Sequence, residues 1–356
     1  MVKRIYNNPE VYYGKGAASA CLKSLDVSSM IMLVSQTVKD TEYFGKILAN
    51  LAEKQPAVET IGSPSWEAIA ELAAKLSSAE KPELIIAIGG GKILDSAKVL
   101  KVMLDNPGVT LEDLKTNQFC DVATTKLIAI PTTPGTGSET NSIAVVRDAD
   151  NHKVPLINSG FVPDLAILDH EFMANLDAQA IYEFSADIFA HAFEGSVSAA
   201  GTPLLAAIAR SAMSLLKTGF EKLRVDSKDP KAHESILHAG HLAGIVQGNA
   251  FVGACHALAH AIEEQKLVSH GQSILLCLKQ TIAWLKDTTQ KPEYDEFMAD
   301  YETLRFDEFK KPEALEGIDP GAWADVALLD PSITTSPIRM KKDNLLVLID
   351  WILNRQ

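Results

Sequence analysis

The chain has 356 residues, a formal net charge of -13 and a hydrophobic fraction of 47%. This composition is typical of a compact globular protein and excludes a largely disordered chain. Because an acidic surface repels phosphate backbones, it also disfavours nucleic acid as a partner. The length predicts two domains rather than one.

The cysteines and the N-terminal residues indicate where the protein works. Cys21, Cys120, Cys255 and Cys277 are widely spaced and form no CxxC pair, which favours a reducing compartment. The opening residues MVKRIYNNPEVYYG lack the apolar core of a signal peptide, and no apolar run reaches the roughly 20 residues of a membrane span. We therefore expect a cytoplasmic protein with no membrane partner.

The first half of the chain alternates short apolar runs with helical patterns. The candidate strands are Met30–Ser35, Leu84–Ile88, Leu127–Ile130 and Leu165–Leu168, and the first two helical patterns are Thr41–Lys54 and Trp66–Leu76. Each run is apolar throughout, as in a strand buried on both faces. The alternation predicts an α/β domain with a parallel sheet, which we place at residues 1–177.

The second half contains helical patterns without an intervening strand signal. These patterns are Ala178–Ala199, Pro203–Leu223, Ala232–Gln247, Ala254–Glu264 and Gln272–Leu285. We therefore expect an all-helical domain at residues 178–356. The segment 286–321 is charged and irregular, and it receives no assignment.

A glycine turn follows the second candidate strand. Its residues are Gly89, Gly90 and Gly91, followed by a helical pattern that carries Lys92, Asp95 and Lys98. Glycines permit a tight turn, and the helix N-terminus that follows offers free N–H groups to an anion such as a pyrophosphate. The turn does not have the GxGxxG pattern of a Rossmann fingerprint. The alternative is a simple strand-to-helix turn with a solvated Lys92.

A second loop follows the third candidate strand and is rich in hydroxyl groups. Residues 131–140 read PTTPGTGSET, and they include Thr132, Thr133, Thr136 and Ser138. Ligands of open α/β sheets bind at the carboxyl ends of strands, where these hydroxyls would donate to a base, ribose or phosphate. The alternative is a surface loop rich in serine and threonine.

Candidate metal ligands occur in the helical half. Asp187 and His191 are four residues apart within an apolar helical run, and His256 and His260 have the same spacing, with His270 in a following turn. A buried carboxylate is costly unless it is paired or binds a metal. One aspartate with three histidines would suit Fe²⁺ or Zn²⁺. Any single histidine is more often structural.

The remaining histidines serve as a comparison. His233, His238 and His241 lie in a helical pattern with polar neighbours, and we interpret them as structural or exposed. His152 and His170 carry no assignment.

These motifs together resemble the iron-containing (group III) metal-dependent alcohol dehydrogenases. The resemblance covers nearly the whole chain, from VYYGKGA through AIGGGKILDSAK, IPTTPGTGSET, VPDLAILDHEFMANL, SADIFAHAFEGSVS, ACHALAH and SHG to SPIRMKKDNL. The threonine-rich loop and the D-x-x-x-H pattern with two later histidines are its specific parts. It implies a dehydroquinate synthase-like architecture, in which an α/β dinucleotide-binding domain is followed by an all-α metal-binding domain.

The resemblance also implies roles for individual residues. Asp187, His191, His256 and His270 correspond to the metal ligands, and His260 corresponds to a non-ligand histidine of the active site. The implied dinucleotide contacts are Gly90, Gly91, Lys92, Asp95, Thr132, Thr133, Thr136, Ser138 and Lys153. The implied cofactors are NAD, with NADP also open, and one divalent metal ion. The implied partner is a small alcohol or aldehyde, and the implied assembly is a homodimer or higher homo-oligomer.

Two positions depart from the family pattern. Gln36 stands where many members carry an acidic residue for the ribose 2′-hydroxyl, which weakens the case for strict NAD preference. The spelling GGGK, in place of GGGS, resembles the glycerol dehydrogenase branch, whereas the D-x-x-x-H pattern fits the iron-type branch. The length and the overall sequence resemble the branch of the family that oxidises the terminal hydroxyl of the sugar acid Kdo, in lipopolysaccharide biosynthesis.

Several alternative functions stay open at this point. Glycerol dehydrogenase-like and maleylacetate reductase-like oxidoreductases would use the same site. A dehydroquinate synthase-like lyase would recycle its hydride, so that no net NADH appears. A non-catalytic binding protein on this fold is the third class.

Overall fold

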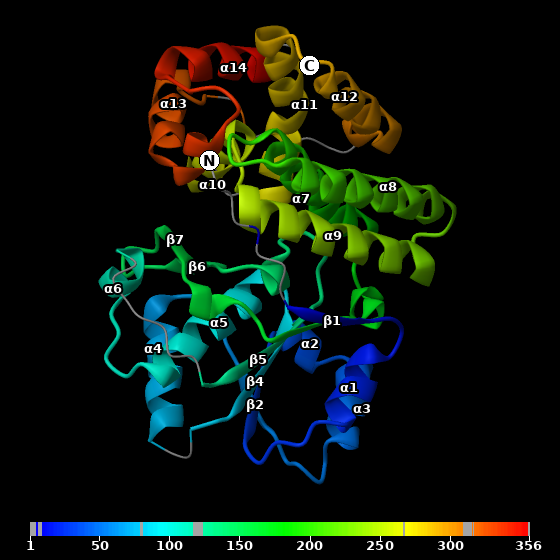
Figure 1. Cartoon of the computed structure of the whole chain (residues 1–356), viewed down its shortest axis with the longest axis vertical. Helices are drawn as coiled ribbons and strands as arrows, with labels where there is room; N and C mark the ends of the chain where they lie inside the picture. The colour runs from blue at the N-terminus through cyan, green and yellow to red at the C-terminus, as the bar shows by residue number, and fades with distance from the viewer. Residues whose placement is uncertain are drawn as a thin grey trace. The chain divides into compact units, whose positions relative to one another are not determined.

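The computed structural model describes residues 5, 9–78, 81–116, 124–265, 268–308, 315 and 317–354. Contacts divide the chain into two compact units, one formed by Tyr6–Asn175 and the other by Leu176–Gln356 with Met1–Ile5. We call them the sheet unit and the helical unit; in Figure 1 they run from blue to green and from green to red. Cys120 lies outside the described residues, and the other cysteines are free thiols.

A six-stranded parallel sheet forms the centre of the sheet unit, as the sequence predicts. Its strands are β1 (Glu10–Tyr13), β2 (Met30–Val34), β3 (Ala57–Thr60), β4 (Leu84–Gly89), β5 (Lys126–Pro131) and β8 (Leu165–Leu168). They are ordered β1-β8-β5-β4-β2-β3, and every neighbouring pair is parallel. The helices of this unit are α1 (Ala17–Lys23), α2 (Gln36–Lys39), α3 (Glu42–Asn50), α4 (Trp66–Ser77), α5 (Gly91–Asp105) and α6 (Leu111–Lys115).

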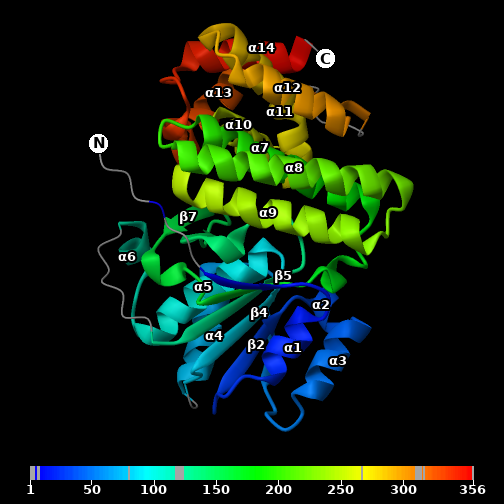
Figure 2. The ribbon, with the colours of Figure 1, turned by 45° about the vertical axis from the view of Figure 1, so that its right-hand side comes forward.

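Both faces of this sheet are buried, which explains the uninterrupted apolar runs. Alternate side chains of a strand point to opposite faces. In β2, Ile31 and Leu33 join the core beneath α4 and α5, whereas Met32 and Val34 join the core beneath α1 and α3. Figure 2 shows these two pairs of helices on opposite sides of the sheet.

The sequence analysis missed the strands that are not buried on both faces. β1 and β3 are the edges of the sheet and are largely exposed or half-buried. β6 (Ile143–Arg147) and β7 (Lys153–Ile157) form a separate antiparallel hairpin, and every second residue of β7 is buried. A search for fully apolar runs overlooks such strands, because only part of each one leaves water.

The helical unit contains no strand among its described residues. Its long helices are α7 (Ala178–Val197), α8 (Pro203–Val225), α9 (Pro230–Ala250), α10 (Ala254–Gln265), α11 (His270–Thr289), α12 (Glu293–Leu304), α13 (Pro320–Leu329) and α14 (Lys342–Asn354). The segment 286–321, left without assignment, holds the end of α11, all of α12 and the start of α13, while its residues 309–314 and 316 lie outside the described part.

Within the described part of the chain, no single helix is both long and apolar enough to cross a membrane, and one helix pair bent by 101° passes that test only when its members are taken together.

Candidate functional site

The glycine turn packs closely against the threonine-rich loop. Gly89 is the last residue of β4, Gly90 is the N-cap of α5, and Gly91 is the first residue of α5. A Cβ on Gly91 would lie 2.8 Å from Thr136 Cγ2, and one on Gly90 would lie 3.0 Å from Thr133 Oγ1. Glycine is required here because side chains of the second loop fill the space. The structure thus brings together the two loops that the sequence singles out.

These loops lie where the direction of the chain across the sheet reverses. After β2 the chain continues to β3 on one side, whereas after β4 it continues to β5 on the other. Open α/β sheets bind ligands beside such a reversal, outside the carboxyl ends of the strands. Ser35 and Gln36 follow β2 at this edge, and the N-terminus of α5 follows β4. The topology therefore supports a nucleotide site formed by these loops.

Two of the predicted cofactor contacts bind each other. Asp95 Oδ1 accepts the Ser138 hydroxyl at 2.5 Å, and Asp95 Oδ2 accepts the backbone N–H of Val145 at 2.9 Å. Burial raises the pKa of Asp95, and the Lys98 ammonium, 3.9 Å away, opposes that rise. Both carboxylate oxygens are therefore engaged in tying the threonine-rich loop and β6 to α5.

Lys98 completes this connection from inside the unit. Its side chain is fully buried, and its ammonium donates to the carbonyl of Ile143 at 2.7 Å and to Asn141 Oδ1 at 3.1 Å. Burial lowers the pKa of Lys98 to about 8, although Asp95 and Glu139 act in the opposite direction. Lys98 thus fixes the chain that follows the threonine-rich loop.

The other predicted cofactor contacts occupy separate elements. Lys92 is exposed in the first turn of α5, Thr132 is buried directly after β5, and Lys153 begins β7. Lys92 lies where an anion at the helix N-terminus would meet it. The roles of these residues in cofactor binding stay predictions.

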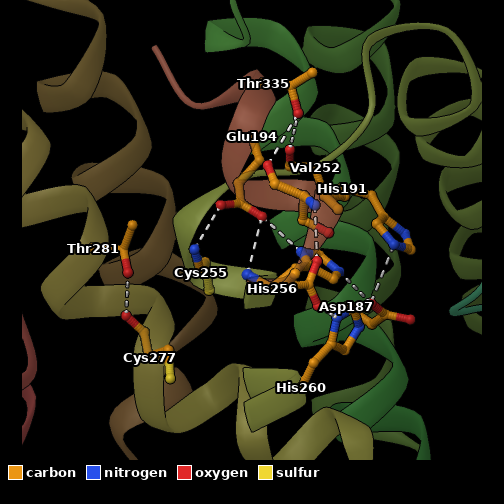
Figure 3. A network of polar contacts seen from close by, with 12 residues as sticks. Asp187, His191, Glu194, Val252, Cys255, His256, His260, Cys277, Thr281 and Thr335 are labelled. Carbon is orange, nitrogen blue, oxygen red and sulfur yellow. Dashed lines mark hydrogen bonds and ion pairs between the residues drawn. The ribbon is translucent and has the colours of Figure 1, made fainter. Parts of the chain in front are cut away.

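Three imidazoles of the helical unit converge on one carboxylate oxygen of Asp187. Asp187 and His191 lie one turn apart on α7, while His256 comes from α10 and His270 begins α11. Asp187 Oδ1 lies 3.4 Å from His191 Nε2. It lies 3.3 Å from Nε2 of both His256 and His270. Figure 3 shows Asp187, His191 and His256 pointing toward one another.

The three separations from Asp187 Oδ1 fit the ligands of a single divalent metal ion, and the ligand atoms of Asp187, His256 and His270 all lie within 4.8 Å of one another, a group that His191 does not join. Tetrahedral ligands at about 2.0–2.2 Å from an ion lie about 3.4 Å from one another. Asp187 is 3% exposed, and a carboxylate so deeply buried is costly without a counter-charge. One oxygen and three imidazole nitrogens suit Fe²⁺ or Zn²⁺. The spacing of Asp187, His256 and His270 therefore fits the predicted metal, and His191 stays a predicted fourth ligand.

Two further carboxylates support the imidazoles, and the sequence analysis missed both. Glu194 Oε2 lies 2.6 Å from His256 Nδ1, and Glu263 Oε1 lies 2.5 Å from His270 Nδ1. A carboxylate only accepts, so each Nδ1 carries a proton, and Nε2 is the nitrogen that would bind an ion. The one available signal was Glu194, an acidic residue in the apolar run that contains Asp187 and His191.

The clustered charges shift one another's pKa values. Burial raises the pKa of Asp187, but His191 and His270 outweigh burial and hold it well below its usual range. Burial lowers the pKa of His191 to about 4. Burial also lowers the pKa of His270, but Asp187 and Glu263 outweigh burial and raise it to about 10. Asp187 is therefore ionised at neutral pH, as a metal ligand must be.

His260 lies beside the cluster and has its own carboxylate. Its Nδ1 lies 2.7 Å from Asp330 Oδ2, and its ring stacks on that of His270 with centroids 5.4 Å apart. Burial lowers the pKa of His260, and Asp330 opposes the shift. The structure places His260 next to the four predicted ligands, while Asp330, from the end of α13, gave no signal in the sequence.

The comparison histidines lie on other elements than the predicted metal ligands. His233 is 2% exposed, and its Nε2 lies 3.1 Å from the carbonyl of Ser227. His241 is buried and His238 half-buried, both on α9. His152 is exposed and His170 is buried, and both belong to the sheet unit.

The chain combines two features. The sheet unit has a glycine turn beside the point where the direction of the chain across the sheet reverses, and the helical unit has a buried cluster of Asp187 with three histidines. This combination is typical of two-domain proteins that bind a nucleotide and a metal ion. The iron-containing alcohol dehydrogenase model matches residues 8–170, and the C-terminal model of the Fe-containing alcohol dehydrogenase family matches residues 183–319. The chain belongs to the iron-containing alcohol dehydrogenase family.

The curated relatives differ in how much of their length the chain covers. The bifunctional aldehyde-alcohol dehydrogenase AdhE of Escherichia coli K12 is 35% identical over 57% of this chain, which spans 24% of that relative. The aldehyde-alcohol dehydrogenase of Streptococcus pneumoniae TIGR4 is 27% identical over 82% of this chain, which spans 35% of it. The NADPH-dependent butanol dehydrogenase of Clostridium saccharobutylicum is 28% identical over 79% of this chain, and the match covers 73% of that relative.

Solved structures share the fold along the whole chain. An iron-containing alcohol dehydrogenase from Thermococcus thioreducens is similar with a TM-score of 0.84, 22% identity, and coverage of 99% of this chain and 100% of that one. A sulfoacetaldehyde reductase from Bifidobacterium kashiwanohense, in complex with NAD⁺, has a TM-score of 0.88, 18% identity and full coverage of both chains at 100%. These likenesses confirm the predicted fold class.

Proposed function

We propose that this protein is a metal-dependent oxidoreductase that transfers a hydride between an alcohol or aldehyde and NAD or NADP. The observation that carries the proposal is the cluster of three imidazole Nε2 atoms around Asp187 Oδ1. Membership of the family and the relatives named as butanol or aldehyde-alcohol dehydrogenases support it. The NAD⁺ complex of the sulfoacetaldehyde reductase supports the cofactor.

The side chains of the helical unit would have two separate roles, metal binding and proton transfer. Asp187, His191, His256 and His270 would hold the divalent ion, Fe²⁺ or Zn²⁺. A bound ion of this kind acts as a Lewis acid that lowers the pKa of a hydroxyl and polarises a carbonyl. His260 would take up or return the hydroxyl proton at Nε2, since an imidazole titrates in the useful range and Asp330 engages its Nδ1. Hydride acceptance belongs to the nicotinamide.

Within this class, the proposed substrate is a small alcohol or aldehyde, with the terminal hydroxyl of Kdo as the sugar-type candidate. Kdo as a substrate is supported only by the resemblance in length and overall sequence. Glycerol dehydrogenase-like and maleylacetate reductase-like activities use the same machinery and are tested alongside it. A dehydroquinate synthase-like lyase is the least favoured, because both matched family models describe alcohol dehydrogenases.

The decisive test is a spectrophotometric assay of reduced cofactor. The purified protein is loaded with Fe²⁺ or Zn²⁺ and given NAD⁺ or NADP⁺ with primary alcohols, glycerol, propanediol or Kdo. We expect metal-dependent formation of reduced cofactor with at least one of these alcohols. Bound metal and bound nucleotide without any signal across the panel would shift support to the hydride-recycling lyase.

Gln36 provides a prediction on cofactor preference. Its side-chain amide donates to both carboxylate oxygens of Asp40, at 3.0 and 3.1 Å. In the substitution Gln36→Asp, a carboxylate would stand beside the ribose and repel a 2′-phosphate. We expect the ratio of kcat/KM with NAD⁺ to kcat/KM with NADP⁺ to rise at least about tenfold, which corresponds to about 1.4 kcal/mol.

The matched control for this prediction is Gln36→Asn, which has nearly the same shape as the aspartate variant but no charge. The asparagine variant should keep the wild-type ratio of the two kcat/KM values. Equal ratios in the aspartate and asparagine variants would show that this position does not face the ribose.

The homodimer or higher homo-oligomer and the cytoplasmic location stay predictions from the sequence. Size-exclusion chromatography with light scattering would measure the assembly directly.

A further inference from the structure

Glu194 is a buried acidic residue to which the proposed function gives no role. It lies on α7, its side chain is 3% exposed, and both of its carboxylate oxygens are engaged. Oε1 accepts the backbone N–H of Cys255 at 2.7 Å. Oε2 accepts Nδ1–H of His256 at 2.6 Å and lies 3.4 Å from the backbone N–H of the same residue. Figure 3 shows this carboxylate between Cys255 and His256.

These contacts join two helices that each carry proposed metal ligands. Asp187 and His191 are on α7 with Glu194, whereas Cys255 and His256 are in the first turn of α10. The first N–H groups of a helix lack partners within the helix, and Glu194 accepts from them across the gap between the two elements. Glu194 therefore caps α10 and places His256 against the ligands of α7.

The turn before α10 is shaped to admit this carboxylate. A Cβ on Gly253 would lie 2.9 Å from Glu194 Oε1, so a larger residue would push the carboxylate away from its present position. The preceding residue is held from another direction, since Thr335 Oγ1 donates to the carbonyl of Val252 at 2.5 Å. The backbone is thus fixed on both sides of the glycine.

We infer that Glu194 is a positioning residue that selects the His256 tautomer able to bind metal. A carboxylate offers only acceptors, so Glu194 requires an imidazole proton on Nδ1 of His256, and Nε2, 3.3 Å from Asp187 Oδ1, is the nitrogen left to bind an ion. The inference rests on the proposed metal site and adds a determinant of metal affinity outside the four ligands. His191 lacks such support within the described part of the chain, where its buried Nδ1 has no hydrogen-bond partner.

The substitution Glu194→Gln tests this role with little change of shape. A glutamine amide has one acceptor oxygen and one donor nitrogen, whereas Cys255 N–H and His256 Nδ1–H both need acceptors. If the oxygen faces Cys255, the NH₂ group faces Nδ1 and favours the tautomer with the proton on Nε2. If the oxygen faces His256, the Cys255 N–H loses its partner. Either arrangement mismatches one buried donor.

The experiment measures metal affinity and the coordination spectrum, not only activity. Metal-free wild type, Glu194→Gln and Glu194→Asp are titrated with Co²⁺ against a competing chelator, and the visible spectrum of bound Co²⁺ is recorded. We expect Glu194→Gln to bind about 10–100-fold more weakly and with a changed spectrum. Glu194→Asp keeps two acceptor oxygens and should recover part of the affinity.

The control variant is Glu221→Gln, which removes one negative charge from an exposed position on α8. It should leave Co²⁺ affinity within about twofold of wild type. Circular dichroism of each metal-free protein shows whether it is folded, and if the glutamine variant fails to fold, the comparison of Glu194→Asp with wild type decides.

The outcomes separate this inference from the proposed function. A wild type that binds no Co²⁺ overturns the metal site itself. A wild type that binds one equivalent, with a folded Glu194→Gln of equal affinity and identical spectrum, overturns the role of Glu194 alone. In the aspartate variant the shorter side chain draws the carboxylate back from His256 Nδ1, so wild-type affinity together with a wild-type spectrum in that variant also overturns the role of Glu194.

Discussion

Replacing His256 with alanine should remove bound metal and abolish metal-dependent activity. The substitution deletes one of three nitrogen donors around Asp187 Oδ1 and leaves the buried carboxylate of Glu194 without its imidazole. Loss of a supporting residue alone costs about 10–100-fold in metal affinity, so loss of a ligand should cost at least about 100-fold. Metal content by elemental analysis and kcat/KM with the best alcohol measure the two effects.

The control for this prediction is His238→Ala, on α9 in the same unit and not among the four predicted ligands. It should keep one equivalent of metal and wild-type kcat/KM. Full metal content together with full activity in His256→Ala would refute the ligand assignment.

Lys98→Met should destabilise the sheet unit strongly. The substitution preserves most of the side-chain length but removes the ammonium that donates to Ile143 and Asn141 and that faces Asp95. Breaking a buried ion pair by removing one partner costs about 3–5 kcal/mol, because the remaining charge stays buried. At the lower end of that range, the midpoint of thermal unfolding should fall by about 6–12 °C.

Thermal unfolding followed by circular dichroism measures this effect. The matched control is Lys75→Met, because the Lys75 side chain is 64% exposed and pairs with Glu59 at 2.7 Å. An exposed pair contributes about 0–1 kcal/mol, so this variant should unfold close to the wild-type temperature. Equal shifts in the two variants would show that the buried connection adds no stability.

The Lys98 and Glu194 contacts share a physical feature. In each case a charged side chain within one element satisfies backbone groups of another: Lys98 on α5 serves the carbonyl of Ile143, and Glu194 on α7 serves the N–H of Cys255. Buried polar groups of the backbone are costly when unpaired, so each contact fixes the loop or helix that it reaches. Both proposed binding regions therefore depend on charged residues that lie within the quoted motifs but received no binding role from the sequence analysis.

The sequence by itself determined the elements whose signals are local. β2, β4, β5 and β8 were recognisable because both faces of the sheet exclude water and each strand is an unbroken apolar run. Asp187 and His191 were recognisable because a spacing of four places them on one face of a helix. The glycine turn was recognisable because only glycine tolerates the close approach of Thr136.

Only the tertiary structure decided which distant residues meet. Glu194 contacts His256 and Asp330 contacts His260 across sequence separations of 62 and 70 residues, and no periodic pattern encodes such pairings. The edge strands and the β6–β7 hairpin were missed because half-buried strands carry too little apolar signal. Asp95 and Ser138, predicted to face a cofactor, bind each other, since a buried carboxylate takes whichever donors the packing brings within reach.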